Sequence, residues 1–191
     1  MLFTADLNLK NERALIKECI AGNRIYQNEL YKMYAPQMMG ICLRYAKTKQ
    51  DAEDVLQEGF IQVFTCIKQF KFKGALDAWM RKIFINCALQ KLREKENNYS
   101  FIDIDYAPEV NNLICNPAEN FDAKELIKCI QALPLVCRLV FNLYVFEGLK
   151  HKEIAELLNI SEGTSKSNLF DARTKLKKQL TINEPLLIQT F

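Results

Sequence analysis

The chain of 191 residues is poor in the residue types on which most enzymes and metal proteins depend. It has one histidine, His151, and it has neither a glycine-rich phosphate loop nor a pair of cysteines in a CxxC pattern. These gaps remove the usual constellations for acid–base catalysis, phosphate binding and zinc binding. We therefore expect a protein with no catalytic residues, no metal and no cofactor.

The chain also lacks an apolar run of membrane-spanning length, and it does not begin with a basic stretch followed by an apolar one. An odd number of cysteines without a pairing pattern is typical of small buried side chains in a reducing compartment. We therefore expect a cytoplasmic protein without disulfides and without membrane insertion. The seven cysteines are Cys19, Cys42, Cys66, Cys87, Cys115, Cys129 and Cys137.

Glycine and proline are scarce, with six and five residues, and strand-like alternation is nearly absent. Apolar residues instead recur every three to four positions, which predicts an all-α protein. The stretch 97–120 interrupts this pattern, because it holds two prolines and no basic residue. We expect two small helical domains, at 10–96 and 121–180, joined by this flexible linker and followed by a tail at 181–191.

The periodicity also predicts where the helices lie. In the first domain they are expected at 11–21, 25–45 and 51–70, with a fourth that begins near Leu76. The outer face of this fourth helix is expected to show Arg81, Lys82, Lys91 and Arg93. In the second domain, helices at 121–133 and 135–146 come before a helix-turn-helix.

The helix-turn-helix is predicted for the segment EIAELLNISEGTSKSNL, which begins at Glu153. Its first helix stops at Asn159, and Ser161 can accept a backbone hydrogen bond at the start of the second. Residues 166–178 carry five basic side chains and one acidic one, a net charge of +4. The buried face of this second helix is expected to hold Leu169, Ala172 and Leu176. Its other faces are expected to carry Ser165, Lys166, Asn168, Arg173, Lys175, Lys177 and Lys178. This pattern is expected of a recognition helix in a DNA major groove, although an ordinary helical hairpin with a solvated basic face also has it.

The first domain separates its charges along the chain. Residues 51–58 hold four acidic side chains and no basic one, whereas residues 68–95 hold eight basic and two acidic ones. Four acids exceed what a helix dipole alone requires, so we expect one surface for a basic partner and an adjoining one for phosphates.

Aromatic residues alternate with lysines just before the fourth helix, in the sequence FKFK from Phe70. Unpaired bases stack on aromatic rings beside cations, each contributing about 1–3 kcal/mol. The alternative is packing in the core, which the helical register favours for Phe70 and Trp79. For Phe72 both interpretations stay open.

Three stretches together resemble the extracytoplasmic-function (ECF) sigma factors, the smallest members of the main bacterial sigma family. The first two stretches form one conserved block and the third forms the other. Two blocks in this order and spacing are far more specific than a single helix-turn-helix. The resemblance omits only the first ten residues, the linker and the tail. The stretches are DAEDVLQEGFIQVF from Asp51, KQFKFKGALDAWMRKIFINCALQKLREK from Lys68, and LPLVCRLVFNLYVFEGLKHKEIAELLNISEGTSKSNLFDARTKLKKQL from Leu133.

The resemblance implies a factor that binds core RNA polymerase and directs promoter-specific transcription initiation by reading the −10 and −35 elements. The acidic helix would dock on the clamp helices of the largest polymerase subunit. The loop and the fourth helix would capture a flipped −10 base and melt the duplex, and the recognition helix would read −35 DNA. An anti-sigma factor is a common further partner in this family.

The resemblance also implies a set of site residues for each of these partners. The polymerase-binding residues would be Asp51, Glu53, Asp54, Gln57 and Glu58. The −10 DNA-binding residues would be Lys71, Phe72, Lys73, Arg81, Asn86 and Gln90. The −35 DNA-binding residues would be Ser165, Lys166, Ser167, Asn168, Phe170 and Arg173.

The chain departs from the family pattern at a few of these positions. Phe72 and Lys73 stand where the base-capture loop usually has a glycine and then an acid, so we expect a different loop shape and base preference. Asp171 stands where an arginine is common, which removes a phosphate contact and would alter how the duplex is read. Ser165 replaces a β-branched apolar residue, which either loosens the seat of the recognition helix or adds a polar contact.

Two other functions stay open on the residues alone. A stand-alone helix-turn-helix regulator would bind duplex promoter DNA by itself, whereas a sigma factor would do so only with core polymerase. A helical adaptor whose basic faces are merely solvated would bind no DNA in any context.

Overall fold

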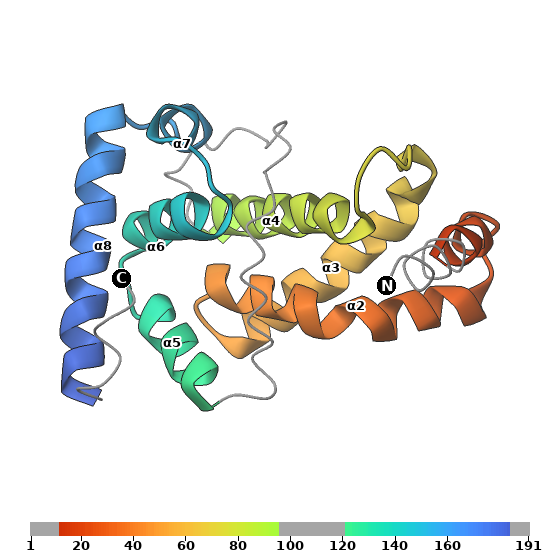
Figure 1. Ribbon diagram of the computed structural model, residues 1–191, viewed down its shortest axis with the longest axis horizontal. Helices are drawn as coiled ribbons and strands as arrows, with labels where there is room; N and C mark the ends of the chain where they lie inside the picture. The colour runs from red at the N-terminus through yellow and green to blue at the C-terminus, as the bar shows by residue number, and fades with distance from the viewer. Residues whose placement is uncertain (1–11, 96–120, 184–191) are drawn as a thin grey trace, which may run out of the picture.

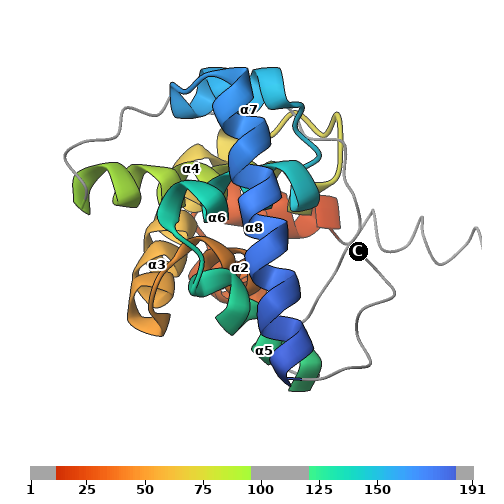
Figure 2. The ribbon, with the colours of Figure 1, turned by 90° about the vertical axis from the view of Figure 1, so that its left-hand side faces the viewer.

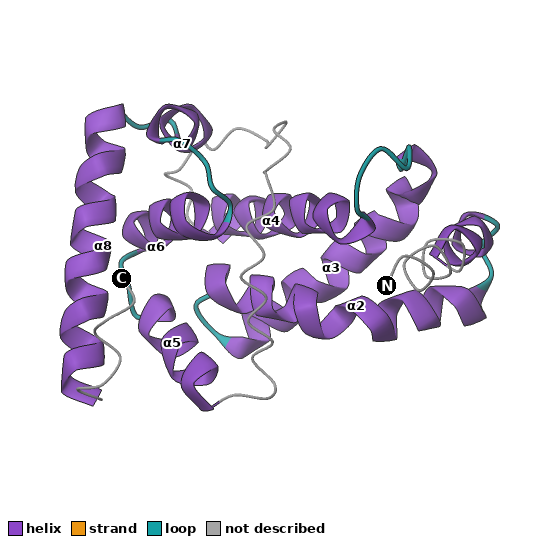
Figure 3. Ribbon diagram, in the orientation of Figure 1, coloured by secondary structure: helices purple, strands orange, loops and turns teal. Residues whose placement is uncertain are grey.

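The structure is a computed structural model that describes residues 12–95 and 121–183. All regular structure in these two ranges is helical, which confirms the predicted all-α fold (Figures 1 and 3). The predicted linker, Cys115 and most of the predicted tail lie outside the described residues. Within the described ranges, no helix is long and apolar enough to cross a membrane.

The helices lie close to their predicted positions. The first range holds a helical segment at 12–20, α2 (Arg24–Tyr45), α3 (Lys49–Cys66), a 3-10 turn (Ile67–Gln69) and α4 (Leu76–Lys95). The second range holds α5 (Phe121–Gln131), α6 (Leu135–Phe141), a π-helical turn (Asn142–Phe146), α7 (His151–Leu158) and α8 (Glu162–Asn183).

The start of α3 differs from the prediction by two residues. The sequence predicted a first residue at Asp51, whereas the helix begins at Lys49. The reason is Thr48, whose Oγ1 accepts a hydrogen bond from the backbone N–H of Asp51 at 3.1 Å and so caps the helix. Asp51 therefore lies in the first turn, where its carboxylate favours the positive end of the helix dipole.

Helices α2, α3 and α4 pack against one another around an apolar core. The ring of Phe60 on α3 meets that of Phe84 on α4 edge-on, with centroids 5.2 Å apart, and Tyr31 on α2 lies 4.6 Å from Phe60. At Gly59 the approach is so close that a Cβ would overlap the Phe84 ring. This contact fixes how α3 crosses α4, and therefore fixes the surface that the two helices share.

In the second range, α8 is a long helix that packs against α6 and α7 (Figure 2). The predicted turn is confirmed: Asn159 ends α7 in the left-handed conformation, with φ of 52°, and Ser161 Oγ accepts a hydrogen bond from Thr164 N at 2.9 Å. The predicted inner face of α8 is also confirmed, since its three apolar residues are all buried. These are Leu169, Ala172 and Leu176.

Candidate polymerase and nucleic-acid interfaces

An acidic surface lies along the first half of α3. Lys91 of α4 approaches it, with Nζ 3.8 Å from Asp54 Oδ2 and 3.6 Å from Glu58 Oε2. Glu53 pairs with Lys49 one turn earlier at 3.3 Å. Ion pairs this exposed contribute little, so a basic partner can displace them. The five predicted polymerase-binding residues are all on this helix: Asp51 and Glu53 are half-buried, and Asp54, Gln57 and Glu58 are exposed.

A groove between α3 and α4 lies beside the acidic surface. Its volume is about 460 Å³, within the range of pockets that hold small ligands. Asn86 and Gln90, two of the predicted −10 residues, line it together with the ring of Trp79 and the cation of Lys82. Side-chain amides, an aromatic ring and a cation are the groups that hold an extruded base and its phosphate. The other lining residues are Glu58, Gln62, Cys66, Gln69, Ile83 and Cys87.

Sequence reasoning missed Gln62, Gln69 and Lys82 as groove residues. It also favoured the core for Trp79, which is half-buried: its ring packs on the core and lines the groove as well. A signal for Lys82 was present, because residues 79, 82, 83, 86 and 90 recur at the spacing of one helix face. The two glutamines gave no such signal. Gln62 on α3 and Gln69 in the 3-10 turn after it line the groove because α3 crosses α4 at Gly59.

The loop between α3 and α4 carries the three remaining exposed −10 candidates. Phe70 is buried and contacts the ring of Trp79 at 5.5 Å, which confirms its predicted place in the core. Phe72 is 38% exposed and has a positive φ of 56°, a conformation that glycine adopts more easily. Its ring lies 5.0 Å from Phe70. Lys71 and Lys73 flank it and are exposed, so one aromatic ring and two cations face solvent here.

The prediction that Arg81 lies on the outer face of α4 is wrong. Its side chain is 7% exposed, and Nη1 lies 3.7 Å from Oε2 of Glu147, a residue of the second range. Helical periodicity identified the face of α4 but not what covers it. A DNA contact by Arg81 requires that this face first be uncovered.

The recognition helix α8 presents four of its six predicted −35 residues to solvent. Phe170 is the most prominent, at 70% exposure. Lys166 is paired with Glu162 one turn earlier, with Nζ 2.7 Å from Oε1, and this pairing lowers the pKa of the Glu162 carboxyl. Arg173 lies with its guanidinium 5.7 Å from the centre of the Tyr144 ring. The four exposed residues are Lys166, Ser167, Phe170 and Arg173.

Ser165 does not face outward as predicted, since it is fully buried. Its Oγ lies 2.9 Å from Nδ1 of His151, whose ring stacks on Tyr144 with centroids 4.7 Å apart. Where the family usually has a β-branched apolar residue that packs, this chain has a serine that forms a hydrogen bond between α7 and α8. Of the two expected effects of this departure, the structure shows the added polar contact, and His151 is its partner.

Asn168 is half-buried, and its side-chain amide is already engaged. Nδ2 donates to the backbone oxygen of Thr164 at 2.8 Å, and Oδ1 accepts from the thiol of Cys137 at 3.2 Å. A base contact by this amide must compete with both hydrogen bonds.

The cysteines of the described ranges are free thiols, and no group of histidine, cysteine and carboxylate residues in those ranges could hold a metal. Burial raises the pKa of Cys42 to about 12 and that of Cys87 to about 11. Both side chains are therefore protonated and unreactive at neutral pH. Cys66 and Cys87 are half-buried rather than buried, because they line the groove.

Comparison with known families matches the two halves of the chain separately. The family described as Sigma-70 region 2 matches residues 30–97, and the family described as Sigma-70, region 4 matches residues 123–176. The chain belongs to the ECF sigma factors. It directs promoter-specific transcription initiation by RNA polymerase. We call residues 12–95 the region 2 domain and residues 121–183 the region 4 domain.

Curated relatives extend the match over most of the chain. The ECF RNA polymerase sigma factor SigM of Bacillus subtilis is 29% identical over 151 residues, covering 78% of this chain and 92% of that protein. The RNA polymerase sigma-H factor of Pseudomonas aeruginosa is 25% identical and covers 95% of this chain and 98% of that protein. The sigma factor RpoE of Bartonella quintana, solved with the anti-sigma factor NepR, shares the fold, with a TM-score of 0.50 and 18% identity, over 82% of this chain and 98% of that one.

Proposed function

We propose that the two domains of this sigma factor read the promoter by different means. The region 2 domain docks on core polymerase and holds the melted −10 strand, and the region 4 domain reads the −35 duplex. The observation that supports this division is the contrast in shape between the groove of the region 2 domain and the exposed face of the basic helix α8.

In the region 2 domain, the acidic surface of α3 supplies the polymerase contact. Strand opening needs only a place that holds an extruded base better than the duplex does, and unstacking costs a few kcal/mol. The groove supplies such a place next to the polymerase contact, with Trp79, Asn86 and Gln90 around the base. Lys71 and Lys73 follow the phosphates of the displaced strand.

In the region 4 domain, Lys166, Phe170 and Arg173 form the reading surface of α8. Lysine and arginine contact phosphates or the acceptor edge of guanine, and an exposed aromatic ring packs on a thymine methyl. Asp171 is exposed among them and repels phosphate, so it favours a register in which it points away from the backbone.

The protein performs no covalent chemistry of its own and works in the cytoplasm with the polymerase. The acidic surface of α3 also suits an anti-sigma factor that competes with core polymerase for the same carboxylates.

Mapping of transcription start sites tests this function. The purified protein is added to core polymerase and a pool of genomic promoter fragments, and the new start sites are sequenced. Starts that share two spaced motifs are expected. Tight binding to duplex DNA without core polymerase, and no new starts with it, would instead show a stand-alone regulator. Binding to neither DNA nor core polymerase would show an adaptor.

A further inference from the structure

The region 4 domain caps the end of a helix that belongs to the region 2 domain. The last carbonyl groups of a helix have no partner within it. At the end of α2, Gln131 Nε2 of α5 donates to the carbonyl oxygen of Leu43 at 3.0 Å, and Asn142 Nδ2 donates to that of Arg44 at 2.8 Å. Two side-chain amides of one domain thus bind the backbone of the other.

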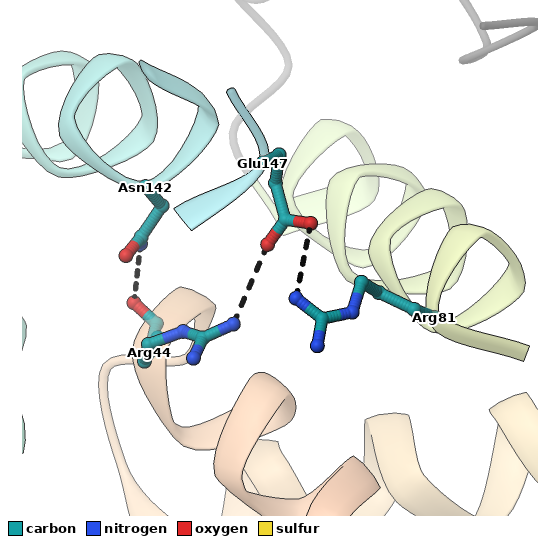
Figure 4. Close-up of polar contacts among 4 residues, drawn as sticks. All are labelled: Arg44, Arg81, Asn142 and Glu147. Carbon is teal, nitrogen blue, oxygen red and sulfur yellow. Dashed lines mark hydrogen bonds and ion pairs between the residues drawn. The ribbon is translucent and has the colours of Figure 1, made fainter. Parts of the chain in front are cut away.

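Beside this cap, one carboxylate of the region 4 domain lies between two guanidinium groups of the region 2 domain (Figure 4). Glu147 Oε1 lies 3.4 Å from Arg44 Nη2, and Glu147 Oε2 lies 3.7 Å from Arg81 Nη1. All three side chains are buried, with Glu147 at 2% exposure. Arg44 also lies over the ring of Phe146, 4.1 Å from its centre.

We propose that Arg44 and Arg81 form a carboxylate-binding site on the region 2 domain, and that Glu147 fills it to hold the two domains in a closed, inactive arrangement of the free protein. We call these three residues the interdomain clasp. The claim that the clasp keeps the protein inactive rests on the function proposed above. The claim that it keeps the free protein closed is independent of that function.

The promoter geometry requires that the clasp open. The −10 and −35 elements are named for positions roughly 25 base pairs apart, which is about 85 Å of duplex at ~3.4 Å per base pair. A compact chain of this length has a radius of gyration of about 16 Å, so it spans roughly 40 Å. The closed arrangement therefore cannot engage both elements of one promoter, and it keeps Arg81 buried.

The chemistry of the clasp suits a contact that opens. Taking charges out of water costs much of what a buried ion pair gains, so such a pair selects a geometry more than it stabilises one. In agreement, burial raises the pKa of Glu147, although Arg44 and Arg81 oppose this. Core polymerase then needs to supply only a modest free energy to separate the domains.

Small-angle X-ray scattering of the free full-length protein tests the closure without polymerase or DNA. We expect a compact wild-type protein and a radius of gyration at least about a quarter larger in Glu147→Gln, because this change leaves two buried guanidinium groups without their carboxylate. Arg81→Gln breaks the clasp from the other domain and should expand the protein in the same way. Glu156→Gln is the matched control, since it removes one exposed carboxylate from α7, and it should leave the wild-type radius.

Circular dichroism distinguishes opening from unfolding, because opened domains keep their helices. A wild-type protein already expanded in solution, or two folded clasp variants as compact as Glu156→Gln, would overturn the proposal. Start-site mapping separately tests the proposed function, which is promoter-directed initiation. An expanded Glu147→Gln with no promoter-directed starts in any variant would refute the proposed function and leave the clasp standing.

Discussion

The two proposed DNA-reading surfaces differ in shape more than in charge. The region 2 domain offers a groove between two helices, beside a loop with two exposed lysines. The region 4 domain offers the exposed face of a single helix, from which Lys166, Phe170 and Arg173 project. A concave surface can enclose one base that has left its stack, whereas a helix enters a groove of intact duplex. We therefore propose that the groove between α3 and α4 serves melting and that the exposed face of α8 serves duplex reading.

Charge reversal on α3 should have the largest effect. The triple change of Asp51, Glu53 and Asp54 to lysine places like charges against a partner that binds carboxylates, which costs several kcal/mol. We expect co-purification with core polymerase to weaken by about 100-fold or more. The helix content by circular dichroism should be unchanged. The control is Glu156→Lys on α7; equal retention of both variants on core polymerase would refute the docking surface.

Truncation on α8 should affect the −35 element alone. Lys166→Ala and Arg173→Ala should each weaken binding to the −35 element by about 1–3 kcal/mol if the side chain reads a base. If the side chain instead contacts a phosphate, binding should weaken uniformly across sequences. The slope of log affinity against log salt concentration should then fall by about 1. Transcription from templates with intact and mutated −35 sites measures the difference. No effect on either template would remove these residues from the interface.

Adding one methyl group should affect the two domains in opposite directions. Gly59→Ala should destabilise the region 2 domain by about 1–3 kcal/mol, because its Cβ meets the Phe84 ring. Gly163→Ala should stabilise α8 by about 0.5–1 kcal/mol, because its Cβ would meet only Ser161 Oγ, at 3.6 Å. Thermal unfolding of both variants measures the pair. Equal shifts of the unfolding temperature in the two variants would show that packing does not require a glycine at position 59.

Removal of two neighbouring hydroxyl groups should have the smallest effect. Ser165→Ala breaks the hydrogen bond to His151 and should destabilise the protein by about 1 kcal/mol, with −35 sequence preference unchanged. Ser167→Ala removes an exposed hydroxyl that donates to Thr164 O, and should change stability less. A changed −35 preference in Ser165→Ala would mean that this residue reads DNA after all.

Local features of the sequence predicted much of the candidate site. The acidic surface was predictable because four acids without a base in eight residues stand out before any folding. The turn of the helix-turn-helix was predictable because Asn159 and Ser161 act on their own neighbours in the chain. The groove was predicted only in part: Asn86 and Gln90 were named, whereas Gln62 and Gln69 join them from another element.

The outward predictions for Arg81 and Ser165 failed for a shared reason. Polar side chains at these positions match a solvent-facing pattern, yet each has a partner elsewhere in the fold: Arg81 meets the buried Glu147, and Ser165 meets the half-buried His151. Hydrophobic periodicity cannot anticipate a polar pair that is satisfied inside the protein.

The sequence by itself determined the helices, their caps and the two charged surfaces, because these depend on residues within a few positions of one another. The tertiary structure alone decided which faces are covered. Arg44 and Glu147 are 103 residues apart in the chain and meet at 3.4 Å. No local pattern encodes that contact, since it exists only when the two domains pack together.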